Sequence, residues 1–233
     1  MVNGIKERIA LIRAEIREAA EKCGRNPGDI KLMGVSKYHP LDKMLEASGY
    51  VELLGENKVQ EAADKKASWP EENKTPLHLI GHLQRNKARK ALEIFDLIES
   101  VDSPELALTL NRILGETGRT GYPVYAEINM SGEESKSGAA PESASELIRT
   151  IIKECPHLVL EGLMTIATHT DNEEDIRKSF ISLRELRDKT EAEYEISIPE
   201  LSMGMSGDYR IAIEEGSTIV RIGTAIFGAR EYN

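Results

Sequence analysis

The chain has 233 residues, of which 40% are hydrophobic and 30% are charged, and this composition is typical of a globular protein rather than a disordered one. Its 30 Lys and Arg against 40 Asp and Glu give a formal net charge of −10, which argues against general binding to nucleic acid. No apolar run approaches the ~18 residues of a membrane span, and the charged start (Lys6, Glu7, Arg8) lacks an apolar secretory core, so we expect a cytoplasmic protein without membrane contact.

Strands and helices are predicted in alternation along the chain. The first helix has apolar residues at helical spacing: Ile5, Ile9, Ile12, Ile16 and Ala19. Gly24 and Pro27 end it, an apolar run at 30–36 predicts the first strand, and a helix follows at 40–48. Further strands are predicted at 51–54, 77–80, 97–100, 124–128, 159–166, 200–202 and 219–222, and further helices near 58–67, 84–94, 104–117, 142–154, 172–192 and 208–215.

This succession predicts the fold class. Eight strands, with a helix after each of the first seven, imply parallel pairing through helical crossovers. Eight such units in ~200–250 residues fit an α/β fold of the closed (β/α)₈ TIM-barrel type better than an open doubly wound sheet, which is the alternative. Without a linker or a shift in composition, we expect a single domain over residues 1–233 with an extra N-terminal helix. Its functional site should lie in the loops after the strands.

Lys37 directly follows the first predicted strand. A solvated lysine at the rim of the barrel is one interpretation. The other is a lysine that forms a Schiff base, which requires a neutral amine, whereas free lysine has a pKa of ~10.4. The crowded mouth of a barrel, with other cations nearby, would lower that pKa and make the nitrogen nucleophilic. An aldolase-like barrel, in which Lys37 attacks a sugar-phosphate carbonyl without a cofactor, uses the same chemistry.

Two turns that contain glycines and hydroxyl residues follow the last two predicted strands. They span residues 201–207 and the pair Gly223 and Thr224. TIM barrels often bind phosphate at these two loops, on backbone N–H groups, so the pattern predicts a phosphate site; ordinary turn glycines are the alternative. A nucleotide-binding loop is rejected, because Gly228 is not followed by Lys and Ser or Thr.

Other polar residues have structural interpretations. Asn57 with Gln60 three residues later fits a capping box, and Asp208 is more typical of a helix cap than of a catalytic group. His78 and His82 are four residues apart without a metal-binding motif around them, and the two cysteines form no CxxC pair, so no metal site is expected. A solvated helix face explains the cluster Arg85, Lys87, Arg89 and Lys90.

Five segments together resemble one family from the first strand to the last. They are Val35-Ser36-Lys37, Gly55-Glu56-Asn57, His78 to Lys87, Leu201 to Ser206 and Val220 to Gly228. They are similar to the YggS/PROSC family of pyridoxal 5′-phosphate (PLP) homeostasis proteins, which share the barrel of the alanine racemase N-terminal domain and lack the second domain of that enzyme.

The resemblance implies a cofactor and the residues that bind it. Lys37 would carry PLP covalently as an internal aldimine. The other implied contacts are Ser206, Gly223 and Thr224 at the phosphate, Arg221 at the pyridine nitrogen, and Asn57 and Met203 within the same motifs. One departure is Lys58, where the family pattern leads us to expect an aromatic residue.

The residues and the resemblance then predict a function. Arg221 is permanently protonated and would keep the pyridine nitrogen unprotonated, which makes the cofactor a poor electron sink. We therefore expect a non-catalytic monomer that stores PLP or delivers it to PLP-dependent apoenzymes. The alternative is a PLP-dependent amino-acid racemase-like enzyme, which would need a second base that alanine racemase takes from its other domain.

Overall fold

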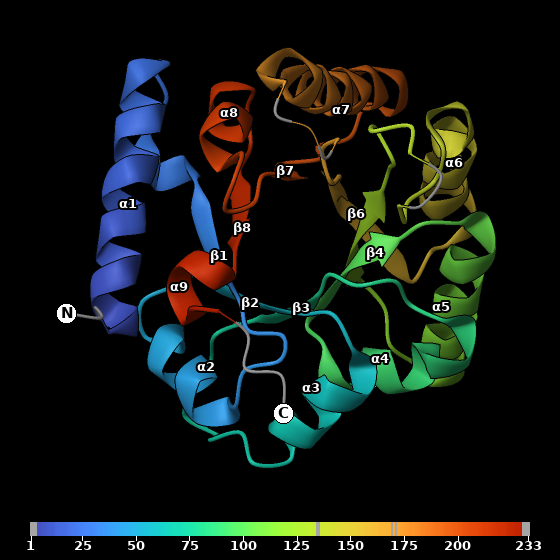
Figure 1. Cartoon of the computed structure of the whole chain (residues 1–233). Coiled ribbons are helices and arrows are strands. Elements are labelled where there is room, and N and C mark those ends of the chain that lie inside the picture. Colours follow the sequence, from blue (N-terminus) through green and yellow to red (C-terminus); the bar gives the residue numbers. More distant parts are fainter. Residues whose placement is uncertain (1–3, 134–135, 169, 171, 230–233) are drawn as a thin grey trace.

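The computed structural model describes residues 4–133, 136–168, 170 and 172–229, and within them eight strands form a closed barrel in the order β1 to β8 (Figure 1). All neighbouring strands are parallel, and the pairing of β1 with β8 closes the ring. The strands are β1 (Lys31–Val35), β2 (Leu53–Glu56), β3 (Leu77–Leu79), β4 (Leu97–Val101), β5 (Tyr122–Glu127), β6 (Leu158–Met164), β7 (Glu200–Ser202) and β8 (Ile219–Ile222). The predicted TIM barrel is confirmed, and the open sheet is excluded.

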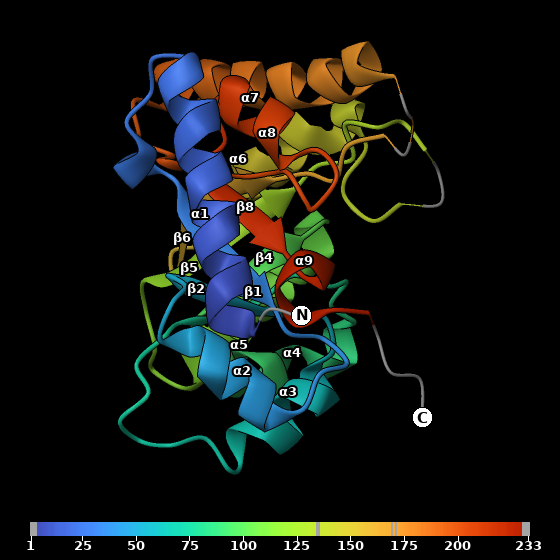
Figure 2. The same ribbon diagram turned by 60° about the vertical axis from the view of Figure 1, so that its left-hand side comes forward.

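Helices surround this ring of strands (Figure 1). They are α1 (Ile5–Lys22), α2 (Leu41–Ser48), α3 (Val59–Lys66), α4 (Ala88–Ile94), α5 (Pro104–Glu116), α6 (Ala144–Glu154), α7 (Glu173–Tyr194), α8 (Tyr209–Glu214) and α9 (Thr224–Phe227). The extra N-terminal helix α1 packs against α2, α8 and α9 (Figure 2). In the described part of the chain, no helix has both the length and the apolar character that a bilayer crossing requires.

The alternation of side chains along each strand divides the core into two parts. Residues of one parity point outward and form, with the helices, a large apolar layer around the barrel. Residues of the other parity point inward, where the apolar side chains form a small cluster: Met33, Val35, Leu53, Leu97, Tyr125, Met164 and Ile219. Polar inward residues, among them Glu99, Glu127, Ser202 and Arg221, lie nearer the C-terminal ends of the strands, and Glu127 and Arg221 line the floor of the site described below.

The second strand begins later than its sequence pattern predicts, at Leu53 instead of Val51. The Glu52 carboxylate accepts a hydrogen bond from the Leu32 N–H at 2.9 Å, so a side chain occupies this backbone donor of β1 before the strand pairing starts at Leu53. The strand continues to Glu56, because Gly55 and Glu56 pair with His78 and Leu79 of β3.

The predicted bounds of β7 and β8 coincide with the structure, and most other boundaries differ by one to four residues. The helix predicted at 84–94 begins as a 3₁₀ turn, Arg85–Lys87, before α4. Helix α5 begins as its sequence indicates: Ser103 caps it by accepting from the Leu106 N–H, and Pro104 is its first residue. Helix α9 was not predicted, since its four residues are too few to show a helical period.

Candidate functional site

A cavity of about 630 Å³ opens at the C-terminal ends of the strands. This volume is within the range of ~300–1,000 Å³ that is typical of small-molecule sites. Its walls come from loops after β1, β2, β3, β6, β7 and β8 and from inward side chains of β5, β6 and β8. The cavity brings together six of the seven predicted site residues: Lys37, Asn57, Ser206, Arg221, Gly223 and Thr224.

Lys37 and Gly223 lie at the seam where the first and last strands pair. Lys37 comes two residues after β1, and Gly223 comes directly after β8. A Cβ added at Gly223 would lie 3.3 Å from the Val35 carbonyl oxygen, which is closer than most Cβ contacts. Glycine therefore allows the two strand ends to approach each other, and the lysine-bearing loop and the Gly223–Thr224 turn share one rim of the cavity.

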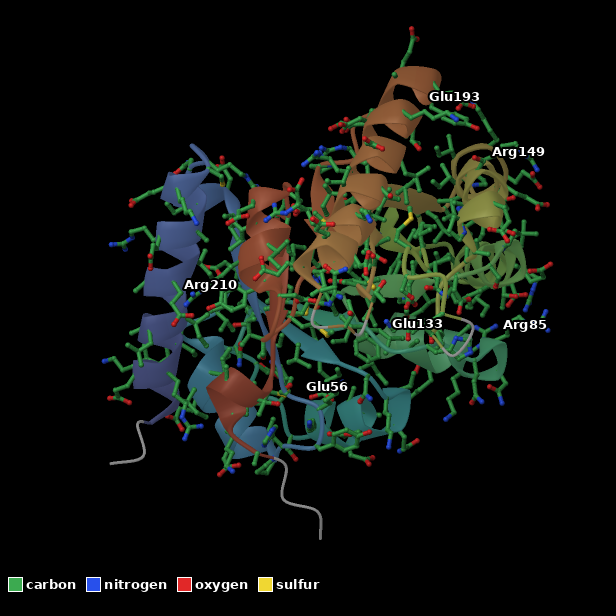
Figure 3. The ribbon with its side chains drawn as sticks, turned by 45° about the horizontal axis from the view of Figure 1, so that its top comes forward. Glu56, Arg85, Glu133, Arg149, Glu193 and Arg210 are labelled. Carbon is green, nitrogen blue, oxygen red and sulfur yellow. The ribbon has the colours of Figure 1, made fainter. Side chains whose placement is uncertain are left out.

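A buried ion pair fixes the residue that precedes Lys37. Ser36 Oγ donates to Glu56 Oε1 at 2.6 Å, and Lys65 Nζ donates to the same oxygen at 2.7 Å and to the Ser36 carbonyl at 3.1 Å. Glu56 is fully buried, and Figure 3 shows it in the interior of the molecule, whereas Arg149 and Glu193 project at the periphery. Burial raises the pKa of Glu56, and the Lys65 ammonium opposes this effect. The end of β1 is thus tied to β2 and α3.

The residues that follow Lys37 are held equally firmly. Tyr38 has a φ of 66°, a left-handed conformation that is rare for a non-glycine residue, and its N–H donates to Glu61 Oε1 at 2.6 Å. The His39 ring stacks on Phe227 of α9 with 5.1 Å between the ring centroids. Since Lys37 lies between fixed neighbours, its backbone is preorganised at the rim of the cavity.

Lys58, the departure from the family pattern, contacts Tyr38. Its Nζ lies 4.8 Å from the centroid of the Tyr38 ring, a cation–π contact. A hydrogen bond from Asn57 lowers the pKa of the Tyr38 phenol, and the charges of Lys58 and Lys37 add to this effect. This part of the rim therefore favours negative charge.

Arg221 lies inside the barrel, in a chain of hydrogen bonds. Its Nη1 donates to the Ser202 carbonyl at 2.5 Å and to Ser202 Oγ at 2.8 Å, and its Nη2 donates to the Thr165 carbonyl at 2.8 Å. Ser202 Oγ donates in turn to Glu99 Oε2 at 2.5 Å, and Glu99 Oε1 pairs with His78 Nδ1 at 2.7 Å. Burial lowers the pKa of Arg221, and the negative charges of Glu99 and Asp208 oppose this. These hydrogen bonds hold the Arg221 guanidinium group in the floor of the cavity.

Two buried polar atoms at the cavity have no partner in the protein. Among the described residues, the buried side-chain atoms without a hydrogen bond include Asn57 Oδ1 and Glu127 Oε2, and both residues line the cavity. Unpaired buried polar atoms are costly, so these positions can receive a ligand. Glu127 was missed in the sequence. The available signal was an acidic residue inside the apolar strand pattern of residues 124–128.

Met203, the seventh predicted site residue, does not line the cavity. Its N–H donates to the Ile219 carbonyl at 3.1 Å, and its fully buried side chain belongs to the outer apolar layer. The alternation along the chain is the reason, because Ser202 points into the barrel and its neighbour must point away from it.

The predicted helix caps are corrected in part. The capping box at Asn57 is wrong: the residue before α3 is Lys58, no side chain caps the helix, and the Gln60 amide donates to Asp64 Oδ1. Asp208 does precede α8, but its carboxylate accepts from the Met205 N–H at 2.6 Å and so closes the turn that carries Ser206.

The two histidines have identifiable partners. His78 pairs with Glu99 inside the barrel, and His82 Nδ1 pairs with Asp102 Oδ2 at 2.7 Å at the rim. The basic cluster is exposed, as predicted for a solvated helix face, and consists of Arg85, Lys87, Arg89 and Lys90.

Comparison with known proteins identifies relatives over nearly the whole chain. Residues 8–231 match the family model of the alanine racemase N-terminal domain. The pyridoxal phosphate homeostasis protein of Aquifex aeolicus (strain VF5) is 40% identical over 227 residues, 97% of this chain and 98% of that protein. PipY of Synechococcus elongatus PCC7942, solved with PLP bound, is 34% identical with a TM-score of 0.80 over 96% of this chain and 100% of PipY.

A more distant comparison concerns the fold alone. The alanine racemase of Clostridium difficile 630 has a TM-score of 0.72 at 19% identity, and the match covers 97% of this chain and 57% of the enzyme. The two proteins therefore share the barrel, and this chain matches only that part of the racemase.

Proposed function

Because the chain belongs to the alanine racemase N-terminal domain family and, within it, to the pyridoxal phosphate homeostasis proteins, we propose that it binds PLP in the cavity at the barrel mouth and stores or delivers it. One observation carries the proposal: a lysine, a turn with glycine and hydroxyl groups, and a buried guanidinium line the same cavity. The relative solved with PLP bound supports the same ligand.

The residues of the cavity fit the parts of PLP. Ser206 and Thr224 offer hydroxyl groups, and Thr224 begins α9, where the first N–H groups of a helix have no partner within the helix. A side chain at Gly223 would reduce the space at this turn. Arg221 offers positive charge in the floor, and Asn57 Oδ1 is a buried atom without a partner. The hydroxyl, backbone N–H and guanidinium donors match a phosphate and an aromatic ring with acceptor atoms, and Asn57 Oδ1 can accept a hydrogen bond from the ligand.

Each group then has a defined part in binding. PLP supplies an aldehyde that condenses with a primary amine and releases water, and the Lys37 side chain provides that amine at the rim. The Gly223–Thr224 turn and Ser206 hold the phosphate. Arg221 has no acceptor atom and keeps its own protons, so a ring nitrogen that faces it stays unprotonated. An unprotonated ring stabilises carbanions poorly, which suits storage better than turnover.

Borohydride reduction followed by peptide mapping tests the proposal. The protein loaded with PLP should be coloured, and reduction should leave one pyridoxyl group on Lys37. Lys37→Ala should abolish both the colour and the label. Lys58→Ala is the matched control, a lysine on the same rim, and it should keep both. A label on another lysine, or a Lys37→Ala protein with unchanged colour, would contradict the assignment.

Two further measurements address storage and delivery. The loaded protein, mixed with the apo form of a PLP-dependent enzyme, should restore the activity of that enzyme. A racemase-like activity would instead appear as steady exchange of the α-proton of single L-amino acids in deuterated water. We expect no such exchange, and its observation would favour the enzyme over the carrier.

A further inference from the structure

We propose that Glu127 is a binding residue of this cavity and that its protonated carboxyl group donates a hydrogen bond to an acceptor atom on the aromatic ring of the ligand. This inference rests on the proposed function and deepens it. It gives a defined role to a side chain that neither the sequence motifs nor the family resemblance singled out.

The side chain of Glu127 points into the barrel at the cavity. Glu127 is the last residue of β5 and lies two residues after Tyr125, so the alternation of the strand points both side chains into the barrel. Its side chain lines the cavity although the residue is only 2% exposed, and its Oε2 is buried without a hydrogen-bond partner. A ligand in the cavity can supply a partner for this oxygen.

The groups around Glu127 are engaged elsewhere. On β4, Glu99 binds His78 and Ser202. At the end of that strand, the carboxylate of Asp102 binds His82 at the rim. Across the barrel, on β8, the two terminal nitrogens of Arg221 are bound to Ser202 and Thr165.

The other neighbours complete the surroundings of the carboxyl. On β6, the residue in register with Glu127 is Met164, which also lines the cavity and does not titrate. Lys37, His82 and Asp208 are the remaining titratable residues that line the cavity in the described part of the chain. Glu99 on β4 and Asp102 just after it therefore place negative charge near Glu127, while their carboxylates bind other residues.

These surroundings favour the protonated carboxyl. Burial raises the pKa of Glu127, the negative charges of Asp102 and Glu99 act in the same direction and Arg221 opposes them, and together they bring this pKa to about 8. At neutral pH the group is then a neutral donor. A neutral donor in the floor does not repel an anionic ligand, and it matches a phenolate oxygen or an unprotonated ring nitrogen. The class of ligand is an anionic aromatic ring with an acceptor at its buried edge.

The binding of 4-deoxypyridoxine 5′-phosphate measures this role separately from the covalent bond. In this analogue a methyl group replaces the aldehyde, so Lys37 cannot attach to it. We would measure its Kd from about pH 6 to pH 9.5 for the wild type, Glu127→Gln and Glu127→Met. Glutamine keeps a donor that does not titrate, and methionine keeps the approximate volume without a donor. Circular dichroism and urea unfolding check that both variants are folded.

The expected results separate the three proteins. At pH 7 Glu127→Gln should bind about as tightly as the wild type, and Glu127→Met about tenfold more weakly. Above about pH 8 the wild type should lose affinity relative to Glu127→Gln, by up to about tenfold per pH unit, because deprotonation removes the donor. Any other pH-dependent effect on the ligand or the cavity is common to both proteins and cancels in this ratio.

Each failure has its own meaning. If the ratio of wild-type to Glu127→Gln Kd does not change with pH, or if Glu127→Met binds as tightly as the wild type, the inference is overturned while the proposed function stands. If the wild type binds neither the analogue nor PLP at any pH, the proposed function fails and this inference fails with it.

Discussion

The two faces of the barrel wall bury different kinds of side chain, although they belong to the same strands. The outward face and the helices bury aliphatic and aromatic residues such as Leu32, Leu54 and Leu110. The inward face, near the C-terminal ends of the strands, buries the charged residues Glu99 and Arg221, which are linked through hydrogen bonds to Ser202. Burying apolar surface stabilises a protein, whereas burying charge costs free energy unless each charge has partners.

This difference assigns separate tasks to alternate residues. The outward layer carries the stability of the fold, and the inward polar groups carry the chemistry of the cavity. A substitution in the outward layer should therefore lower the free energy of unfolding without changing the bound ligand. A substitution of an inward charged group should change the ligand site and can raise stability. The three predictions below test this separation, beginning with the largest effect.

The first prediction concerns the buried Glu56–Lys65 ion pair, which holds Ser36 next to Lys37. This pair is a polar contact within the otherwise apolar layer between the strands and the helices. Lys65→Met leaves the fully buried carboxylate of Glu56 without its cation. We expect a loss of about 3–5 kcal/mol in the free energy of unfolding, measured by urea denaturation, and a loosened Lys37 loop. Lys66→Met, at the next position, should cost less than about 1 kcal/mol. Equal effects for the two variants would show that the pair does not support the loop.

The second prediction concerns the apolar layer. Leu110→Ala removes a fully buried side chain from α5 and should cost about 2–5 kcal/mol. Leu108→Ala, in the same helix, is the matched control, because Leu108 is 42% exposed and its loss should cost about 0.5 kcal/mol or less. Both variants should bind PLP with unchanged Kd per folded molecule. A changed absorbance spectrum of bound PLP in Leu110→Ala would break the proposed separation of tasks.

The third prediction concerns the ligand-free protein and the inward carboxyl of Glu127. Its pKa is about 8 in the folded state, against 4.5 for an ordinary carboxyl, so between these values the folded state binds a proton that the unfolded state has lost. Stability contributed by this proton is complete below about pH 4.5 and falls as the pH rises to 8, by at most about 1.4 kcal/mol per pH unit.

Glu127→Gln isolates this effect. The variant should lack this decline, so its free energy of unfolding relative to the wild type should grow between about pH 5 and pH 8. Urea denaturation at several pH values gives the difference directly, and other titrating groups cancel in it. A constant difference across this range would mean that Glu127 is ionised in the folded protein.

Much of the fold is predictable, because its signals are local. Apolar runs identify the eight strands, and helical spacing identifies the helices between them. Lys37 and Gly223 follow the first and the last strand. Closure of a parallel barrel then places these two residues on one rim. The prediction of a shared site needed only the order of the strands and the rule that sites lie at their C-terminal ends.

The hydrogen bonds that link Arg221, Ser202 and Glu99 inside the barrel could not be predicted from local signals. The Glu99–Ser202 hydrogen bond joins residues that are 103 positions apart, and nothing local to either indicates its partner. The spacing of Asn57 and Gln60 also misleads, because it fits a helix cap, whereas the structure places Asn57 at the cavity. Met203 lies in a site motif, but its side chain is on the outward face of the wall.

The pairing of β1 with β8 has a consequence for synthesis of the chain. The loop that carries Lys37 is synthesised well before the Gly223–Thr224 turn, with most of the barrel between them. Until the final strand is inserted, no nascent chain has a complete site. A ligand that contacts both strand ends binds only the closed barrel, and its binding therefore stabilises the pairing of the first strand with the last.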